Sequence, residues 1–133
     1  MSKITEKVVR KLFDDASKGV SPEELSQFFS EEVDFFVAGD TEHVSWIGKK
    51  NGRKEVASFY SQLSELINSQ KFQIDDILIK GTRAVVLGQL VSEVKKTGKI
   101  IETEFAYDIV VEQEQITRFR MFEDSFAVSE AVK

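Results

Sequence analysis

Apolar residues recur at the spacing of an α-helix in two long stretches of the chain, which predicts two amphipathic helices. The first helix ends at Gly19, a C-terminal cap, and its apolar face carries Ile4, Val8, Val9, Leu12, Phe13 and Ala16. The second follows a glycine-bearing turn, begins at the predicted N-cap Asn51 and runs to about Asn68. Its apolar face carries Val56, Phe59, Tyr60, Leu63, Leu66 and Ile67. Both faces must be buried, so each helix has to pack against other parts of the chain.

A capping box with proline at the first helical position predicts a short helix between the two, at Ser21-Pro22-Glu23-Glu24, carrying Leu25, Phe28 and Phe29. A short strand is expected over 33–38 and a loop over 41–50. The rest of the chain is expected to form strands over 72–80, 84–95, 99–112 and 116–124, and residues 126–132 form a closing helix or a tail. This order predicts an α+β fold in which helices precede an antiparallel meander.

Alternation along the last two predicted strands assigns side chains to the two faces of the sheet. The inner face carries Thr103, Phe105, Tyr107 and Ile109 from one strand and Phe119, Met121 and Glu123 from the other. Arg118 and Arg120 point to the outer face, where a three-residue turn at 113–115 would place Asp108 opposite Arg120 as an ion pair. Two polar groups therefore remain on the inner face, the Tyr107 hydroxyl and the Glu123 carboxyl.

Composition narrows the classes of protein. The 133 residues suffice for one domain over 1–133, and 11 phenylalanines predict an interior built from aromatic rings. A net charge of −5 argues against nucleic acid, which requires a concentrated basic surface. The absence of cysteine excludes disulfides, thiolate metal sites and cysteine nucleophiles. The sequence shows neither a signal-peptide segment nor an apolar run of membrane-spanning length, so we expect a cytoplasmic protein with no membrane partner.

Several segments carry a resemblance to a known superfamily: Trp46-Ile47-Gly48 with residues 52–60, Val85-Val86-Leu87-Gly88, Thr97-Gly98-Lys99, Phe105-Ala106-Tyr107-Asp108 and Ile116-Thr117-Arg118-Phe119-Arg120. In this order they resemble the nuclear-transport-factor-two-like superfamily, in its SnoaL-like and ketosteroid-isomerase-related branch, over nearly the whole chain. The resemblance implies a single SnoaL-like domain with a cone-shaped α+β barrel of cystatin-like topology. N-terminal helices would pack into a strongly curved antiparallel sheet and leave a deep apolar cavity. It also implies a homodimer through the outer face of the sheet.

The residues of the steroid isomerases in this superfamily are not matched. Those enzymes use a base at the end of the first strand, a tyrosine on the first helix and a protonated aspartate in the long strand. An ungapped match gives Val37, Phe13 and Tyr107 at these positions, with Asp34 and Asp40 as the carboxylates nearest to the first. SnoaL-like cyclases often carry histidine at the position of Tyr107. The departures count against steroid isomerisation, and analogy of fold alone does not supply a reaction.

Four residues are candidates for catalysis. Among Phe and Met side chains the Glu123 carboxyl would lose solvation, which raises its pKa towards neutrality, unless it reaches water at the end of the strand. Tyr107 is either a hydrogen-bond donor in the pocket or a core tyrosine. Asp40 and His43, three residues apart in a loop, form either a general base oriented by a carboxylate or an exposed turn with a solvated histidine.

The predicted ligand-binding wall consists of Trp46, Phe13, Phe35, Phe59, Phe105, Phe119 and Met121. Trp46 acts there as a lid, or it plugs one end of the core. A basic turn of Lys49, Lys50, Arg53 and Lys54 forms either an anion site or a solvated surface. The sequence contains no phosphate loop, nucleophile elbow or metal-ligand spacing and has one histidine, so we expect neither a metal nor another cofactor.

Two functions remain open. The first is a pocket for a small, largely apolar organic ligand; an enzyme of this kind would be a cofactor-free isomerase, cyclase or dehydratase that uses general acid–base chemistry. The second is a non-catalytic dimeric ligand-binding or interaction module whose rings close the cavity. An empty cavity of roughly several hundred Å³ would favour the first function, and a solid core the second. An accessory subunit of a larger enzyme, a third alternative, would show an exposed apolar patch beyond the dimer face.

Overall fold

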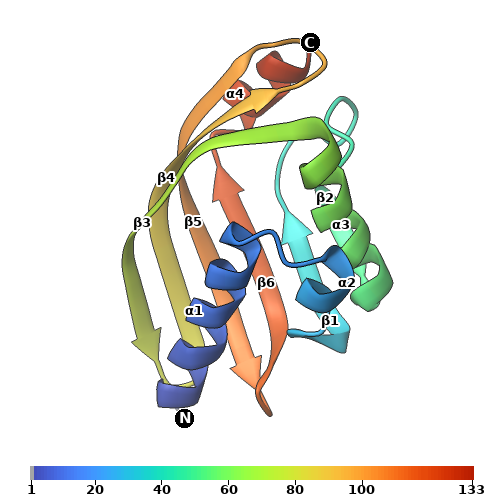
Figure 1. Cartoon of the computed structure of the whole chain (residues 1–133). Coiled ribbons are helices and arrows are strands. Elements are labelled where there is room, and N and C mark those ends of the chain that lie inside the picture. Colours follow the sequence, from blue (N-terminus) through green and yellow to red (C-terminus); the bar gives the residue numbers. More distant parts are fainter. Residues whose placement is uncertain (1) are drawn as a thin grey trace.

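The computed structural model describes residues 2–133, and it shows a curved, unclosed six-stranded sheet with helices packed against its inner face (Figure 1). The elements in chain order are α1 (Ser2–Ser17), α2 (Pro22–Ser26), β1 (Phe29–Val37), β2 (Gly48–Asn51), α3 (Gly52–Leu66), β3 (Ile67–Lys80), β4 (Arg83–Val94), β5 (Ile100–Glu112), β6 (Gln115–Glu123) and α4 (Ser125–Val132). The predicted α+β class is therefore confirmed, with helices before the main run of strands.

The strands lie in the order β2-β1-β6-β5-β4-β3. Strands β3 to β6 form the predicted antiparallel meander, whereas β1 pairs with β6 in parallel. This parallel pair, with Phe35 beside Phe119 and Val37 beside Met121, was not predicted because the two strands lie far apart in the chain. The loop expected over 41–50 was wrong at its C-terminal end, where β2 begins at Gly48. The polar residues of β2 form a strand because their backbone pairs with the edge of β1.

The predicted boundaries need three further corrections. α3 ends at Leu66 rather than near 68, and the next strand begins at Ile67 rather than at 72. α2 ends at Ser26, and Phe29 already belongs to β1. Asn51 is the N-cap residue of α3 without a capping bond from its side chain, and its own N–H donates to the Glu55 carboxylate at 2.7 Å.

The β5–β6 hairpin reaches the predicted register by a different route. Its turn is two residues, Gln113 and Glu114, both with positive φ. The pairing register shifts by one residue between Val110 and Val111, which leaves Thr117 of β6 without a partner. This β-bulge compensates for the shorter turn and places Asp108 opposite Arg120. The predicted alignment of Asp108 with Arg120 was therefore right, although the predicted turn was one residue too long.

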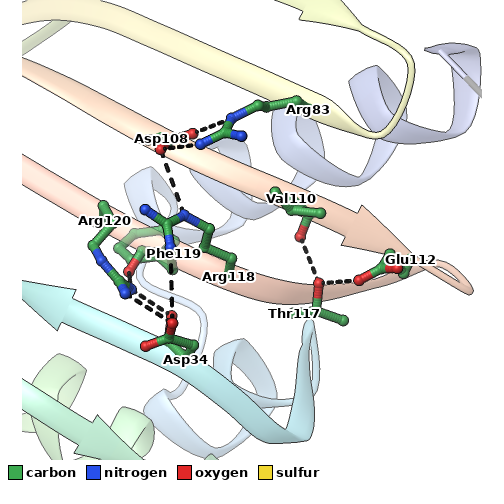
Figure 2. A network of polar contacts seen from close by, with 9 residues as sticks. All are labelled: Asp34, Arg83, Asp108, Val110, Glu112, Thr117, Arg118, Phe119 and Arg120. Carbon is green, nitrogen blue, oxygen red and sulfur yellow. Dashed lines mark hydrogen bonds and ion pairs between the residues drawn. The ribbon is translucent and has the colours of Figure 1, made fainter.

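The predicted Asp108–Arg120 ion pair was wrong, because each side chain finds a better partner on another strand (Figure 2). Asp108 accepts two hydrogen bonds from Arg83 of β4, at 2.8 and 2.7 Å. Arg120 instead donates to the Asp34 carboxylate of β1 at 2.8 Å, and Arg118 lies between both carboxylates, 3.5 Å from Asp108 and 3.8 Å from Asp34. These five residues form a charge ladder across β4, β5, β6 and β1 on the outer face.

Aromatic rings build much of the interior, as the phenylalanine content predicted. Phe29, Phe35 and Phe119 are fully buried, and Phe35 stacks on Phe119 with ring centroids 4.6 Å apart. Gly88 of β4 makes room for another ring, because a Cβ there would lie 2.6 Å from Cζ of Phe105 and would also clash with the carbonyl oxygen of Gln73. The ring of Phe105 therefore lies over the backbone of β4.

Candidate functional site

Three polar groups lie on the inner face, and Tyr107 is within electrostatic range of both Tyr60 and Glu123. Tyr107 projects inward from the middle of β5, Glu123 ends β6, and Tyr60 comes from the third turn of α3. Tyr107 is 8% exposed, whereas Tyr60 and Glu123 are half-buried. Within residues 2–133, neither hydroxyl nor the carboxyl has a hydrogen-bond partner. None of the three groups is therefore committed to another group of the protein.

Burial shifts the ionisation of all three groups. It raises the pKa of Glu123 from the usual 4.5 to about 7, with a smaller contribution from the neighbouring charge of Asp124. Burial also raises the pKa of Tyr60, and it raises that of Tyr107 well above its usual value, with further contributions from Tyr60 and Glu123. The site thus combines one acid that titrates near neutrality with two hydroxyls that stay protonated.

Aromatic rings surround the Tyr107 side chain. Its ring centroid lies 5.0 Å from that of Phe13, 5.2 Å from Phe105 and 5.3 Å from Phe119. The inward orientation of Tyr107 and Glu123 agrees with the strand alternation. Tyr60 was missed as a site residue because its position in the helical stripe identified it only as apolar. A hydroxyl on an otherwise apolar face was the available signal.

Asp40 and His43 come together as the sequence suggested, but on the surface. The Asp40 carboxylate lies 2.8 Å from Nδ1 of His43 and accepts a 2.6 Å hydrogen bond from Ser129 of α4. These two bonds, that of Ser129 first, lower the pKa of Asp40 to about 2. Ser129 was not anticipated, because 89 residues separate it from Asp40. The pair therefore holds an imidazole at the surface and also fastens α4 to the β1–β2 loop.

The Asp40–His43 pair and Glu123 lie at the same end of two neighbouring strands, β1 and β6. β1 and β6 run in parallel with Val37 beside Met121, and the Ala38 N–H donates to the Met121 carbonyl at 3.4 Å. Asp40 and Glu123 therefore follow the same end of two neighbouring strands. Glu42 adds a carboxylate within 4.8 Å of the ligand atoms of Asp40 and His43; Glu42 and His43 are exposed, and Asp40 is half-buried.

Solved structures resemble this architecture over its whole length. An NTF2-like protein from Burkholderia xenovorans LB400 covers 100% of this chain and 98% of its own, with a TM-score of 0.89 at 20% identity. The chain has the nuclear-transport-factor-two-like (NTF2-like) fold. A second NTF2-like protein of unknown function, from Burkholderia pseudomallei K96243, has a TM-score of 0.87 at 18% identity. That match covers 100% of this chain and 99% of the Burkholderia pseudomallei chain.

A candidate SnoaL-like polyketide cyclase from Jannaschia sp. CCS1 shares this NTF2-like fold, covering 99% of this chain and 93% of its own, with a TM-score of 0.78 at 15% identity. No sequence model of a protein family matches the chain, and no curated protein matches it. In residues 2–133 no helix is both long enough and apolar enough to span a membrane.

The predicted wall of the NTF2-like interior is buried except for Phe13, which is half-buried, and many of its rings contact one another. Phe59 packs against Phe35 at 5.0 Å, and Trp46, at 6% exposed, joins the core with Met121. Two grooves open on the surface instead. One, of about 430 Å³, lies between α2 and α3, and the other, of about 480 Å³, lies over β4 and β5 beside Asp124. Neither groove is lined by a residue of the predicted wall.

One side chain of the basic turn has a clear structural role in this NTF2-like fold. The Nε–H of Arg53 donates to the Phe29 carbonyl at 2.7 Å, and Nη1 lies 3.5 Å from the Glu31 carboxylate. Arg53 thus ties the start of α3 to the start of β1. Lys49 and Lys54 are exposed, and Lys50 is half-buried.

Proposed function

We propose that the inner face of this NTF2-like chain binds a small, largely apolar organic molecule and transfers a proton to or from it without a cofactor. The observation that carries the proposal is a half-buried carboxyl, Glu123, with a pKa of about 7 beside the unpartnered hydroxyl of Tyr107. A general acid–base group is most effective when its pKa lies near the working pH.

We also propose a cytoplasmic location, which cell fractionation tests.

Each polar group has a role in the proposed chemistry. Glu123 removes a proton from carbon, or returns one, in an isomerisation, cyclisation or dehydration. The hydroxyls of Tyr107 and Tyr60 donate hydrogen bonds to the oxygen on which negative charge develops, and their raised pKa values keep them protonated. Asp40 and His43 supply a second base near the same ends of β1 and β6. The similarity to a candidate polyketide cyclase supports carbonyl chemistry of this kind.

Deuterium exchange tests the proposal directly. 2-Tetralone is an apolar ketone whose α-protons exchange with D₂O, and NMR follows the exchange without any other reagent. We expect the protein to accelerate exchange with a midpoint near pH 7, and Glu123→Gln to lower the rate by roughly 100-fold or more. Tyr107→Phe and Tyr60→Phe should lower it less. Glu65→Gln, an exposed carboxyl on α3, is the matched control. Unchanged exchange in Glu123→Gln contradicts the assignment.

A non-catalytic dimeric ligand-binding or interaction module is the second candidate. The contacts among the predicted wall rings favour it, since Phe35 stacks on Phe119 and packs against Phe59. A module of this kind does not accelerate 2-tetralone exchange above the rate without protein at any pH, and Glu123→Gln and Glu65→Gln then behave alike. The exchange assay therefore separates the two candidates.

We propose further that the partner is a second copy of the chain, bound through the outer face of the sheet. Strand alternation and register place Glu102 and Glu104 at one end of this face and the charge ladder at the other. The three arginines of the ladder outnumber its two carboxylates, Asp34 and Asp108, so this end carries a net positive charge. Between the two ends lies an apolar row of Phe122, Ala106 and Leu87 on adjacent strands, in which Phe122 is 47% exposed and Leu87 36%. A two-fold axis at this row would place the acidic end of one copy on the basic end of the other.

Charge reversal at the acidic end tests the homodimer. Analytical ultracentrifugation should find a dimer for the native chain and a monomer for Glu102→Lys with Glu104→Lys. Glu65→Lys with Glu114→Lys changes the net charge equally at exposed sites on α3 and in the β5–β6 turn, and should remain dimeric. A monomeric native chain, or equal dimerisation of both variants, contradicts the proposal.

A further inference from the structure

Four rings connect the surface with the inner face. Phe72 of β3 is 41% exposed, whereas Phe105 and Tyr107 of β5 are 4% and 8% exposed. Phe72 stacks on Phe105 with centroids 4.9 Å apart and an interplanar angle of 13°, and on Phe13 of α1 at 6.0 Å and 19°. Phe13 and Phe105 each meet Tyr107 with their planes at steep angles of 67° and 69°. Tyr107 therefore adjoins a stack of near-parallel rings whose most exposed member is Phe72.

The contact between Phe13 and Phe72 lies where α1 meets β3, and side chains hold these two elements together. β3 is the last strand of the unclosed sheet and is hydrogen-bonded to β4 along one edge. α1 lies against the inner face of the sheet (Figure 1). Near the N-terminal end of the helix, the Thr5 hydroxyl donates to the Gly81 carbonyl at 2.8 Å. Phe13 lies two turns beyond this hydrogen bond. Paired strands separate only when ladder hydrogen bonds break, whereas stacked rings separate by side-chain rotation or a small helix shift.

We propose that Phe13 and Phe72 form a gate through which small molecules reach Tyr107 and Glu123. The gate rests on the proposed function in one respect, because it takes the inner face to be the binding site. The rings contact one another in the closed arrangement, so a guest enters when Phe72 or Phe13 moves aside. Removing the Phe72 ring leaves the passage permanently open, because the Phe72 ring is the exposed end of the stack.

Nitration by tetranitromethane reports access to Tyr107 without a ligand. The chain has two tyrosines, and peptide mass spectrometry follows each of them separately. We expect Phe72→Ala to accelerate nitration of Tyr107 at least 10-fold. Leu78→Ala is the matched control, since Leu78 lies on the same strand and is 55% exposed. Its Tyr107 should react at the rate of the native chain.

Phe13→Leu tests the other side of the gate. It opens the passage from α1 and should accelerate Tyr107 nitration as well, which keeps the proposal testable if Phe72→Ala fails to fold. Unchanged nitration in the folded variants, or equal acceleration by Leu78→Ala, overturns the gate.

The 2-tetralone assay separates the gate from the proposed function. Faster nitration together with faster exchange supports both. Faster nitration with no acceleration of 2-tetralone exchange by any variant supports the gate and contradicts the chemistry. Unchanged nitration with Glu123-dependent exchange contradicts the gate and leaves the chemistry in place.

Discussion

Replacing Glu123 with glutamine should change how the stability of the protein depends on pH. In the unfolded chain this carboxyl ionises near its usual pKa of 4.5, whereas in the folded protein it stays protonated up to about pH 7. Between these values the unfolded state binds fewer protons, so the free energy of unfolding falls as pH rises. The difference between the two pKa values corresponds to a loss of roughly 3 kcal/mol by pH 8. Glutamine cannot ionise, so the variant escapes this loss.

Urea unfolding at a series of pH values measures the effect, with the fluorescence of the single, buried Trp46 as the signal. The native chain and Glu123→Gln should have similar stability near pH 4. From pH 4.5 to 7 the variant should become progressively more stable by comparison, up to roughly 3 kcal/mol at pH 8. The difference between the two proteins isolates Glu123, because all other titrating groups are common to both.

Two controls sharpen the result. Glu65→Gln, at an exposed site, should change stability equally at all pH values. Asp124→Asn removes the smaller of the two influences on the pKa of Glu123 and should reduce the pH-dependent loss without abolishing it. A difference between the native chain and Glu123→Gln that does not vary with pH would refute the raised pKa, and with it the acid–base role.

Three further changes test other parts of the structure. Gly88→Ala should destabilise the protein by roughly 1–3 kcal/mol in urea unfolding, because its Cβ would clash with the Gln73 carbonyl oxygen and the Phe105 ring; unchanged stability would contradict that packing. Ser129→Ala should raise the pKa of Asp40 from about 2 towards its usual value in an NMR titration, and a constant value would assign the shift elsewhere. Ser21→Ala should cost roughly 1 kcal/mol because its hydroxyl caps α2, and native-like thermal unfolding would rule the cap out.

Much of the fold followed from local patterns in the sequence. Helical spacing located α1 and α3, and alternation assigned the faces of β5 and β6 correctly, because the direction of a side chain depends on its own backbone. The capping box at the start of α2 was also right, since Ser21 accepts from the Glu24 N–H as predicted. The resemblance supplied the overall architecture, which the NTF2-like structures confirm.

The candidate site was only partly predictable. Alternation placed Tyr107 and Glu123 on one face, and proximity in the chain suggested the Asp40–His43 pair. Tyr60 was not predicted as a site residue, because helical spacing shows that a residue faces the sheet without showing which strand residue it meets. The grooves and the contacts among the rings likewise depend on how side chains from separate elements fill space.

The sequence by itself determined the elements, the inward face of each long strand and the aromatic character of the interior, since these depend on neighbouring residues. Tertiary structure decided which partners meet. The parallel β1–β6 pair brings Asp34 to Arg120 across 86 residues, and α4 brings Ser129 to Asp40 across 89. Such contacts form only when the whole sheet has its register, because no local pattern encodes which distant strand or helix will lie alongside.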